Sequence, residues 1–129
     1  MTQSSVPKPT AGELEILRIL WERGPSTVRA VHALLRQEKD VGYTTVLKLM
    51  QIMTAKGTLR RNQEQRAHVY EACQPAETTK RALAGDVLQR VFQGSASQLM
   101  MHALEGRRTS REELEKLRHL LDEYERGRQ

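Results

Sequence analysis

The first 57 residues contain three stretches in which apolar residues recur every three or four positions. This spacing places apolar side chains on one face of an α-helix, so it predicts three amphipathic helices. Thr10 with Glu13 forms a capping-box pattern before the first helix, and Gly57 suits the end of the third. The residues expected to face the core are Leu14, Ile16, Leu17, Leu20 and Trp21; Val28, Val31, Leu34 and Leu35; and Val46, Leu49, Met50 and Met53.

The polar connections place the starts of the next two helices. "RGP" at 23–25 ends the first helix, so Ser26 or Thr27 is expected to begin the second. The polar stretch 37–42 separates the second helix from the third, which we expect to be capped by Thr44 or a neighbour.

Two short strands are predicted after Gly57, with the sequences "TLRR" and "HVYEA". The intervening "NQEQRA" lacks the Asn-Gly pair of a tight hairpin, so a longer tip is expected. Within the second strand, His68 and Tyr70 are expected to be packed residues. Three helices followed by a basic hairpin predict a winged helix-turn-helix domain over residues 10–74, preceded by a flexible arm at 1–9.

Residues 75–129 predict three further helices. The first begins at Pro75 and ends at Gly94, and Ser95 caps the second. Thr109 and Ser110 each precede a Glu by three residues, as at the start of a third helix. The fold class expected is therefore mainly α with a small β-hairpin.

The last predicted helix carries apolar residues at spacings of three, four and three, which is a short heptad seam. Such a seam serves either local packing or a dimer contact. Because a small DNA-reading domain rarely suffices for specific binding alone, we favour a homodimer held by residues 75–129. The seam residues are Leu114, Leu117, Leu121 and Tyr124.

Charge is distributed unevenly along the chain. The total is 21 basic against 16 acidic residues, a net charge of +5. Residues 41–70 hold Lys48, Lys56, Arg60, Arg61 and Arg66 against one acid, Glu64. A local basic excess of this kind favours a nucleic-acid partner.

Catalytic and metal-binding patterns were not found. The single cysteine excludes a disulfide within the chain, and the four histidines stand in no recognised catalytic or metal-ligand spacing. The chain has neither an apolar run of membrane-spanning length nor an apolar signal core. We therefore expect a soluble cytoplasmic protein that is not an enzyme and has no cofactor, no metal and no membrane partner.

The third predicted helix has the composition of a DNA-reading helix. Short hydroxyls, a lysine and an amide can contact phosphates and base edges. Leu47 is either partly buried by a neighbour or an apolar contact in the groove. The hairpin arginines, Arg60, Arg61 and Arg66, fit a wing that reaches the DNA backbone or minor groove, although a solvated hairpin carries similar clusters. The outward residues of the helix are Thr44, Thr45, Leu47, Lys48 and Gln51.

Three segments together resemble the penicillinase repressor family, which includes copper-responsive relatives. They are "GELEILRILWERGPSTVRAVHALL", "YTTVLKLMQIMTAKG" and "RAHVY", and the resemblance runs from about Thr10 to about Tyr124. It implies a winged helix that reads a palindromic operator and a C-terminal helical part that holds the dimer. The family blocks transcription by occupying a promoter.

The resemblance places the base-reading positions on Thr44, Thr45, Leu47 and Lys48. Thr45 matches the usual Thr, whereas the other three differ from the Lys, Arg and Thr of staphylococcal-type repressors. The operator sequence of those repressors therefore cannot be assigned to this protein.

The resemblance also implies release by a sensor-activated protease, which would then be a further partner. Family members are cut at an Asn-Phe bond, and the matching place here is about His102–Ala103 in "QLMMHALEG". The chain lacks the C-terminal Cys-x-Cys cluster of the copper-responsive branch, so copper sensing of that kind is not expected. The rival to a repressor is a winged-helix protein-protein adaptor with only non-specific DNA affinity.

Overall fold

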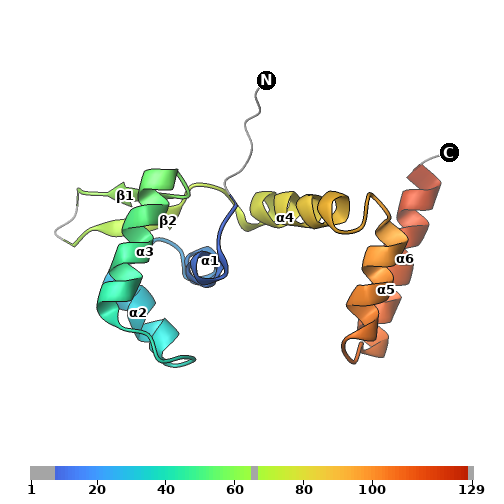
Figure 1. Cartoon of the computed structure of the whole chain (residues 1–129), viewed down its shortest axis with the longest axis horizontal. Coiled ribbons are helices and arrows are strands. Elements are labelled where there is room, and N and C mark those ends of the chain that lie inside the picture. Colours follow the sequence, from blue (N-terminus) through green and yellow to red (C-terminus); the bar gives the residue numbers. More distant parts are fainter. Residues whose placement is uncertain (1–7, 65–66, 128–129) are drawn as a thin grey trace, which may run out of the picture. The chain divides into compact units, whose positions relative to one another are not determined.

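The computed structural model describes residues 8–64 and 67–127 (Figure 1). Within them, three helices precede an antiparallel hairpin and three helices follow it. This order is that of a winged helix with a C-terminal helical extension, so the predicted fold class is confirmed. The elements are α1 (Ala11–Arg23), α2 (Val28–Arg36), α3 (Tyr43–Lys56), β1 (Leu59–Asn62), β2 (Val69–Ala72), α4 (Ala76–Arg90), α5 (Ala96–Glu105) and α6 (Arg111–Gly127).

The ends of the first three helices follow from local chemistry. Thr10 and Glu13 form the predicted capping box of α1, and the Thr27 hydroxyl accepts from the Ala30 N–H at the start of α2. Gly57 ends α3 in the left-handed conformation, with φ 86°. The start of α3 differs from the prediction, because Thr44 lies within the helix and Gly42 occupies the capping position without a side-chain hydrogen bond.

The hairpin pairs Leu59 with Ala72 and Asn62 with Val69, and a third segment joins it. The Ser26 N–H donates to the Tyr70 carbonyl, and the Tyr70 N–H donates to the Ser26 carbonyl. Tyr70 is buried, as predicted. The expectation for His68 was wrong, because the residue precedes β2 and is exposed. Its position just beyond the paired region leaves no neighbouring strand to cover it.

The hydrophobic core lies between α1, α2, α3 and the hairpin. It confirms the helical periodicity, although Leu14, Trp21, Leu34 and Leu49 are only half-buried. The Trp21 indole N–H also donates to the Gln74 carbonyl, which ties α1 to the chain after β2. The buried apolar residues are Ile16, Leu17, Leu20, Val28, Val31, Leu35, Val46, Met50, Met53, Leu59 and Tyr70.

One buried acid joins the first turn of α1 to the last turn of α3. Glu13 is 3% exposed, and both of its carboxylate oxygens accept from the Lys56 ammonium at 3.0 Å. One of them also accepts from the Thr10 N–H at 3.1 Å. Burying a carboxylate is costly unless it is paired and hydrogen-bonded, so this site couples the cap of α1 to the direction of α3.

The chain divides into two compact units between Ala84 and Gly85, a point inside α4. In the second unit, α4 ends at Arg90, earlier than predicted, and Gln93 and Gly94 with φ of 47° and 84° lead to the Ser95 cap of α5. Helices α5 and α6 form a hairpin joined by residues 106–110 (Figure 1). Neither of these two helices has a buried residue in its described part.

The Glu13–Lys56 pair gives a stability prediction. We expect Lys56→Ala to lower the free energy of unfolding by about 2–3 kcal/mol, because it leaves a buried carboxylate without its counter-charge. The measurement is urea denaturation at fixed protein concentration.

Lys39→Ala is the matched control for this prediction. It removes a 3.0 Å ion pair with Glu15 in which both side chains are more than a third exposed, and should cost less than about 1 kcal/mol. Equal small losses for the two variants would show that the buried pair does not hold α3.

Candidate nucleic-acid interface

The exposed face of α3 is the centre of the candidate interface. Val46, Met50 and Met53 point into the core and are fully buried. The residues at the centre of the opposite face, Thr44, Lys48 and Gln51, are spaced by four and three positions, so they form one line along the helix. Thr45 and Ile52 are exposed at the edge of this face, and Ala55 continues its central line four positions after Gln51; the sequence did not single out Ile52 or Ala55.

Lys48 is the basic residue that this face presents. Helix α3 contains no acidic residue and two lysines, Lys48 and Lys56. Because Lys56 is held by Glu13 at the far end of the helix, its charge is already neutralised in the fold. A negatively charged partner along the centre of α3 would therefore meet the hydroxyl of Thr44, the ammonium of Lys48 and the amide of Gln51.

Leu47 occupies the flank of α3 rather than its centre. It is half-buried and packs against the hydrophobic core, which supports the structural alternative. Leu47 also lines a hollow of about 540 Å³ between α2, α3 and the hairpin. The residues around this hollow are Thr27, Val28, Arg29, Tyr43, Leu47, Ala67, His68 and Tyr70.

Arg29, Tyr43 and His68 are polar residues of this hollow that the sequence analysis did not assign to the interface. Each is exposed, and each comes from a different element or loop. Arg29 follows the cap of α2 by two positions, while Tyr43 is the first residue of α3. The strand-like pattern of "HVYEA" hid the exposure of His68, since alternation gave it the same face as Tyr70.

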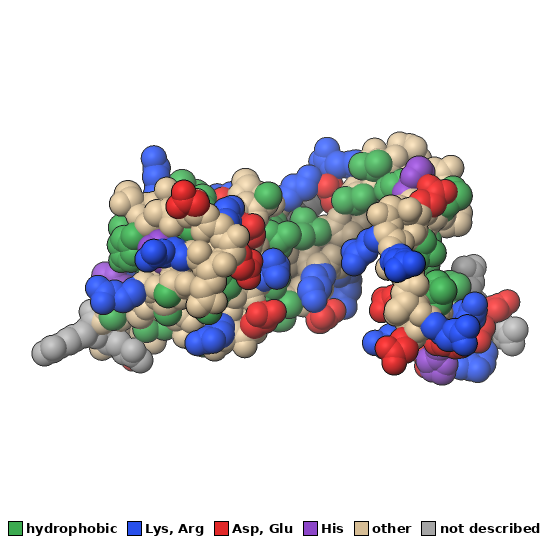
Figure 2. All heavy atoms as spheres, turned by 90° about the horizontal axis from the view of Figure 1, so that it is seen from below, with side chains coloured by type: hydrophobic (Ala, Val, Ile, Leu, Met, Phe, Trp, Pro, Cys, Tyr) green, Lys and Arg blue, Asp and Glu red, His purple; other side chains and the backbone are tan. Residues whose placement is uncertain are grey.

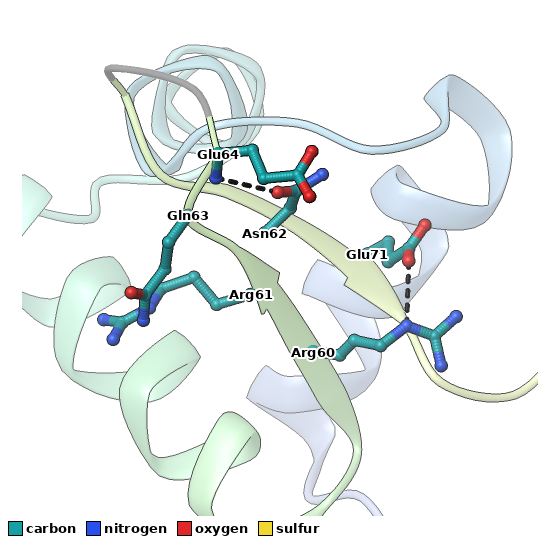
Figure 3. A pocket seen from close by; sticks show the side chains of 6 residues that line it. All are labelled: Arg60, Arg61, Asn62, Gln63, Glu64 and Glu71. Atoms are coloured by element: carbon teal, nitrogen blue, oxygen red, sulfur yellow. Dashed lines mark hydrogen bonds and ion pairs between the residues drawn. The ribbon is translucent and has the colours of Figure 1, made fainter.

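The hairpin separates its two described arginines. Side chains alternate between the faces of a β-strand, and directly paired residues share a face. Arg61 is paired with buried Tyr70 and lies on the α3 side, whereas Arg60 is paired with Glu71 on the opposite side (Figure 3). The structure therefore brings Arg61, but not Arg60, to the side of the hairpin that α3 occupies. Arg66, the third expected arginine, lies outside the described residues.

The two arginines also differ in their partners. Arg60 Nε donates to a Glu71 carboxylate oxygen at 2.8 Å, and this hydrogen bond and the Glu71 charge raise the pKa of Arg60. Arg60 thus remains protonated, but part of its charge is compensated. Arg61, in contrast, has a neutral partner. When the Gln63 amide oxygen faces it, a terminal guanidinium nitrogen of Arg61 donates to that oxygen at 2.6 Å.

The expected dimer residues lie on α6. Leu114 and Leu117 are half-buried, whereas Leu121 and Tyr124 are 60% and 69% exposed. Apolar side chains of the C-terminal helices lie open between charged ones at the right-hand end of Figure 2. Large exposed apolar residues in a row are typical of a surface that another chain covers.

His102 and Ala103, the expected cleavage position, both lie on α5 and are exposed. The centroids of the His102 and Phe92 rings are 5.6 Å apart. In the described ranges, no group of three or more His, Cys, Asp or Glu residues could hold a metal ion. None of the helices in these ranges combines the length and the apolar character that crossing a membrane requires.

The chain is similar to several bacterial regulators. The transcriptional regulator BlaI of Mycobacterium tuberculosis is 33% identical over 120 residues, which cover 90% of this chain and 86% of that protein. The penicillinase repressor of Bacillus licheniformis is 22% identical over 119 residues, covering 92% and 93% of the two chains. The methicillin resistance regulatory protein MecI of Staphylococcus aureus is 20% identical over 113 residues, covering 88% and 92%.

Similarity to solved structures is weaker. A structure of a Lactococcus lactis ZitR mutant aligns with 100% of this chain and 81% of its own, with a TM-score of 0.47 and 16% identity. The model of the penicillinase repressor family, by contrast, matches residues 9–123. That match, together with the 33% identity to a full-length relative, establishes that this chain belongs to the penicillinase repressor family, a family of transcriptional repressors and not of enzymes.

Proposed function

We propose that this protein represses transcription by binding a palindromic operator as a homodimer, with α3 of each protomer in the major groove. The observation that carries the proposal is the acid-free exposed face of α3, with Thr44, Lys48 and Gln51 in one line. A major groove about 12 Å wide admits an α-helix, so this line of polar groups can reach base edges. The names of the relatives, which are repressors or transcriptional regulators, agree with this function.

The side chains on this face suit base reading. A lysine can donate to the O6 and N7 atoms of guanine, and a glutamine can pair with the N6 and N7 atoms of adenine. The methyl groups of Thr44 and Thr45 can contact thymine methyls, while Leu47 would touch DNA only from the wall of the hollow. We therefore assign sequence reading chiefly to Thr44, Thr45, Lys48 and Gln51.

The hairpin is assigned to the DNA backbone or the minor groove. Arg61 is the stronger described candidate, because it lies on the α3 side and its partner Gln63 carries no charge. Arg60 would have to leave Glu71 before it neutralised a phosphate, so its contribution should be smaller. We assign Arg66, which lies between β1 and β2 in the sequence, to the same kind of contact. Contacts of this kind fix position and add to the salt dependence of binding.

We assign dimerisation to residues 75–129 and DNA binding to residues 10–74. The support for a second copy as the partner is that α5 and α6 bury none of their described residues, although α6 carries the row Leu114, Leu117, Leu121 and Tyr124. A self-complementary apolar seam is buried when two copies meet around a two-fold axis. Such a dimer would present two copies of α3 to half-sites separated by a whole number of DNA turns.

Release by a sensor-activated protease at His102–Ala103 remains part of the proposal. His102 and Ala103 are exposed on α5, so a protease could reach them. The peptide bond lies inside a helix, however, so cleavage requires local unwinding of α5.

Selection of random duplex DNA by the purified protein tests the function. We expect a palindromic motif whose half-sites lie about one helical turn, or a multiple of it, apart. Binding of the selected duplex should weaken steeply with salt when measured at two salt concentrations. If no sequence is enriched and only weak, salt-sensitive binding remains, the adaptor function is favoured instead.

Lys48→Ala tests the reading face. We expect binding of the selected duplex to weaken by about 1–3 kcal/mol, as for the loss of one base contact. Lys116→Ala, which removes the same charge from the exposed side of α6, should leave that affinity unchanged. The measurement is a fluorescence-anisotropy titration with the selected duplex, and equal affinities for the two variants would remove Lys48 from the interface.

Aspartates at two seam positions test the dimer. Leu117→Asp with Leu121→Asp should give monomers in sedimentation equilibrium, because two buried charges without partners oppose association. The control is Lys116→Asp with His119→Asp, which adds aspartates on the far side of α6 and should leave the dimer intact. A dimer that survives the leucine substitutions would place the interface elsewhere, such as residues 77–105.

A further inference from the structure

Helix α3 starts without the local cap that other helices of this chain possess. At α1, α2 and α5, the hydroxyls of Thr10, Thr27 and Ser95 accept from a backbone N–H in the first turn. Gly42 stands at the same position of α3 and has no side chain to offer. Glycine also imposes little restriction on its own backbone, so no capping side chain fixes where α3 begins.

A histidine on α2 supplies this missing constraint. The imidazole Nε2 of His32 lies 2.9 Å from the carbonyl oxygen of Val41, nine residues further along the chain. Because a carbonyl oxygen can only accept, Nε2 carries the proton and donates it. His32 is half-buried on α2, whose neighbours Val31 and Leu35 are in the core, so the donor is held by a rigid element.

The same ring contacts the first residue of α3. The centroids of the His32 and Tyr43 rings are 5.7 Å apart and their planes are inclined at 85°, an edge-to-face arrangement. Val41 and Tyr43 are the residues immediately before and after Gly42. His32 therefore holds both sides of the flexible glycine at once.

We infer that His32 is a positioning residue for DNA reading, which fixes from α2 the point and direction at which α3 begins. The inference rests on the proposed function, because its consequence is the orientation of Thr44 and Thr45 toward bases. Successive residues on a helix are separated by about 100°, so a one-residue change in the start of α3 would redirect both side chains. His32 itself need not touch DNA.

Three substitutions separate the two contacts of His32. His32→Gln retains an N–H donor of similar reach but loses the ring, whereas His32→Phe retains the ring but loses the donor. His32→Ala loses both. Trp21→Phe is the control for general stability, because it removes the hydrogen bond from α1 to the Gln74 carbonyl, which is part of neither the His32 contacts nor the Glu13–Lys56 pair.

The first readout is hydrogen–deuterium exchange in the free full-length protein. We expect His32→Ala to accelerate exchange in the peptide covering the α2–α3 connection and the first turn of α3, but not in the peptide covering Met50 and Met53. His32→Gln should restore most of the protection. Unchanged exchange in His32→Ala would overturn the inference, whether or not the protein binds DNA.

The second readout compares affinity for the duplex selected by the unmodified protein with affinity for a scrambled duplex of equal length. We expect His32→Ala to lose about tenfold on the selected duplex, equivalent to about 1.4 kcal/mol, and to bind the scrambled duplex as before. His32→Gln should recover most of this loss, with His32→Phe intermediate. Equal losses in Trp21→Phe and His32→Ala would overturn the positioning role.

The proposed function can fail separately. If selection with the unmodified protein yields no duplex that it binds more tightly than a scrambled one, the repressor function and the role of His32 in reading DNA are both rejected. The exchange experiment would then still decide whether His32 fixes the start of α3.

Discussion

The orientation of α3 depends on two tethers to the rest of the winged helix, and the buried carboxylate of Glu13 is the stronger one. Glu13 is shared between the Thr10 cap of α1 and the Lys56 ammonium in the last turn of α3. At the other end, His32 reaches from α2 to the Val41 carbonyl and the Tyr43 ring. A buried charge that is hydrogen-bonded on several sides tolerates little movement, so the exposed face of α3 has a fixed orientation, as the proposed reading of DNA requires.

The basic residues available at the candidate interface are those that no acid in the described part of the fold pairs with. Lys56 and Arg60 contribute to the net basic charge of the chain, yet each is engaged by a carboxylate, Glu13 or Glu71. Within the described residues, neither Lys48 nor Arg61 forms an ion pair with an acid. Lys48 is exposed on α3, and Arg61 lies on the side of the hairpin that α3 occupies. Net charge therefore indicates the class of partner, whereas the pairing of individual charges determines which residues are available to it.

The second unit has the opposite organisation. The first unit contains the hydrophobic core, while α5 and α6 expose apolar residues along their length. Two helices that bury no side chain gain little stability from packing against each other. This imbalance explains why the proposed function requires a second copy, and why stability and DNA binding should both depend on protein concentration.

The sequence by itself determined the elements of this protein, because caps, stop signals and apolar periodicity are local. It located the Thr10–Glu13 box, the Gly57 stop, the inward faces of three helices and the outward line of Thr44, Lys48 and Gln51. Only the tertiary structure decided which of the remaining candidates are exposed and unpaired on the side of the hairpin that α3 occupies. The partial burial of Leu47, the exposure of His68, the ion pairs of Lys56 and Arg60 and the hydrogen bond from His32 all depend on contacts between separate elements. Periodicity describes one element at a time, whereas these contacts arise only when elements pack against each other.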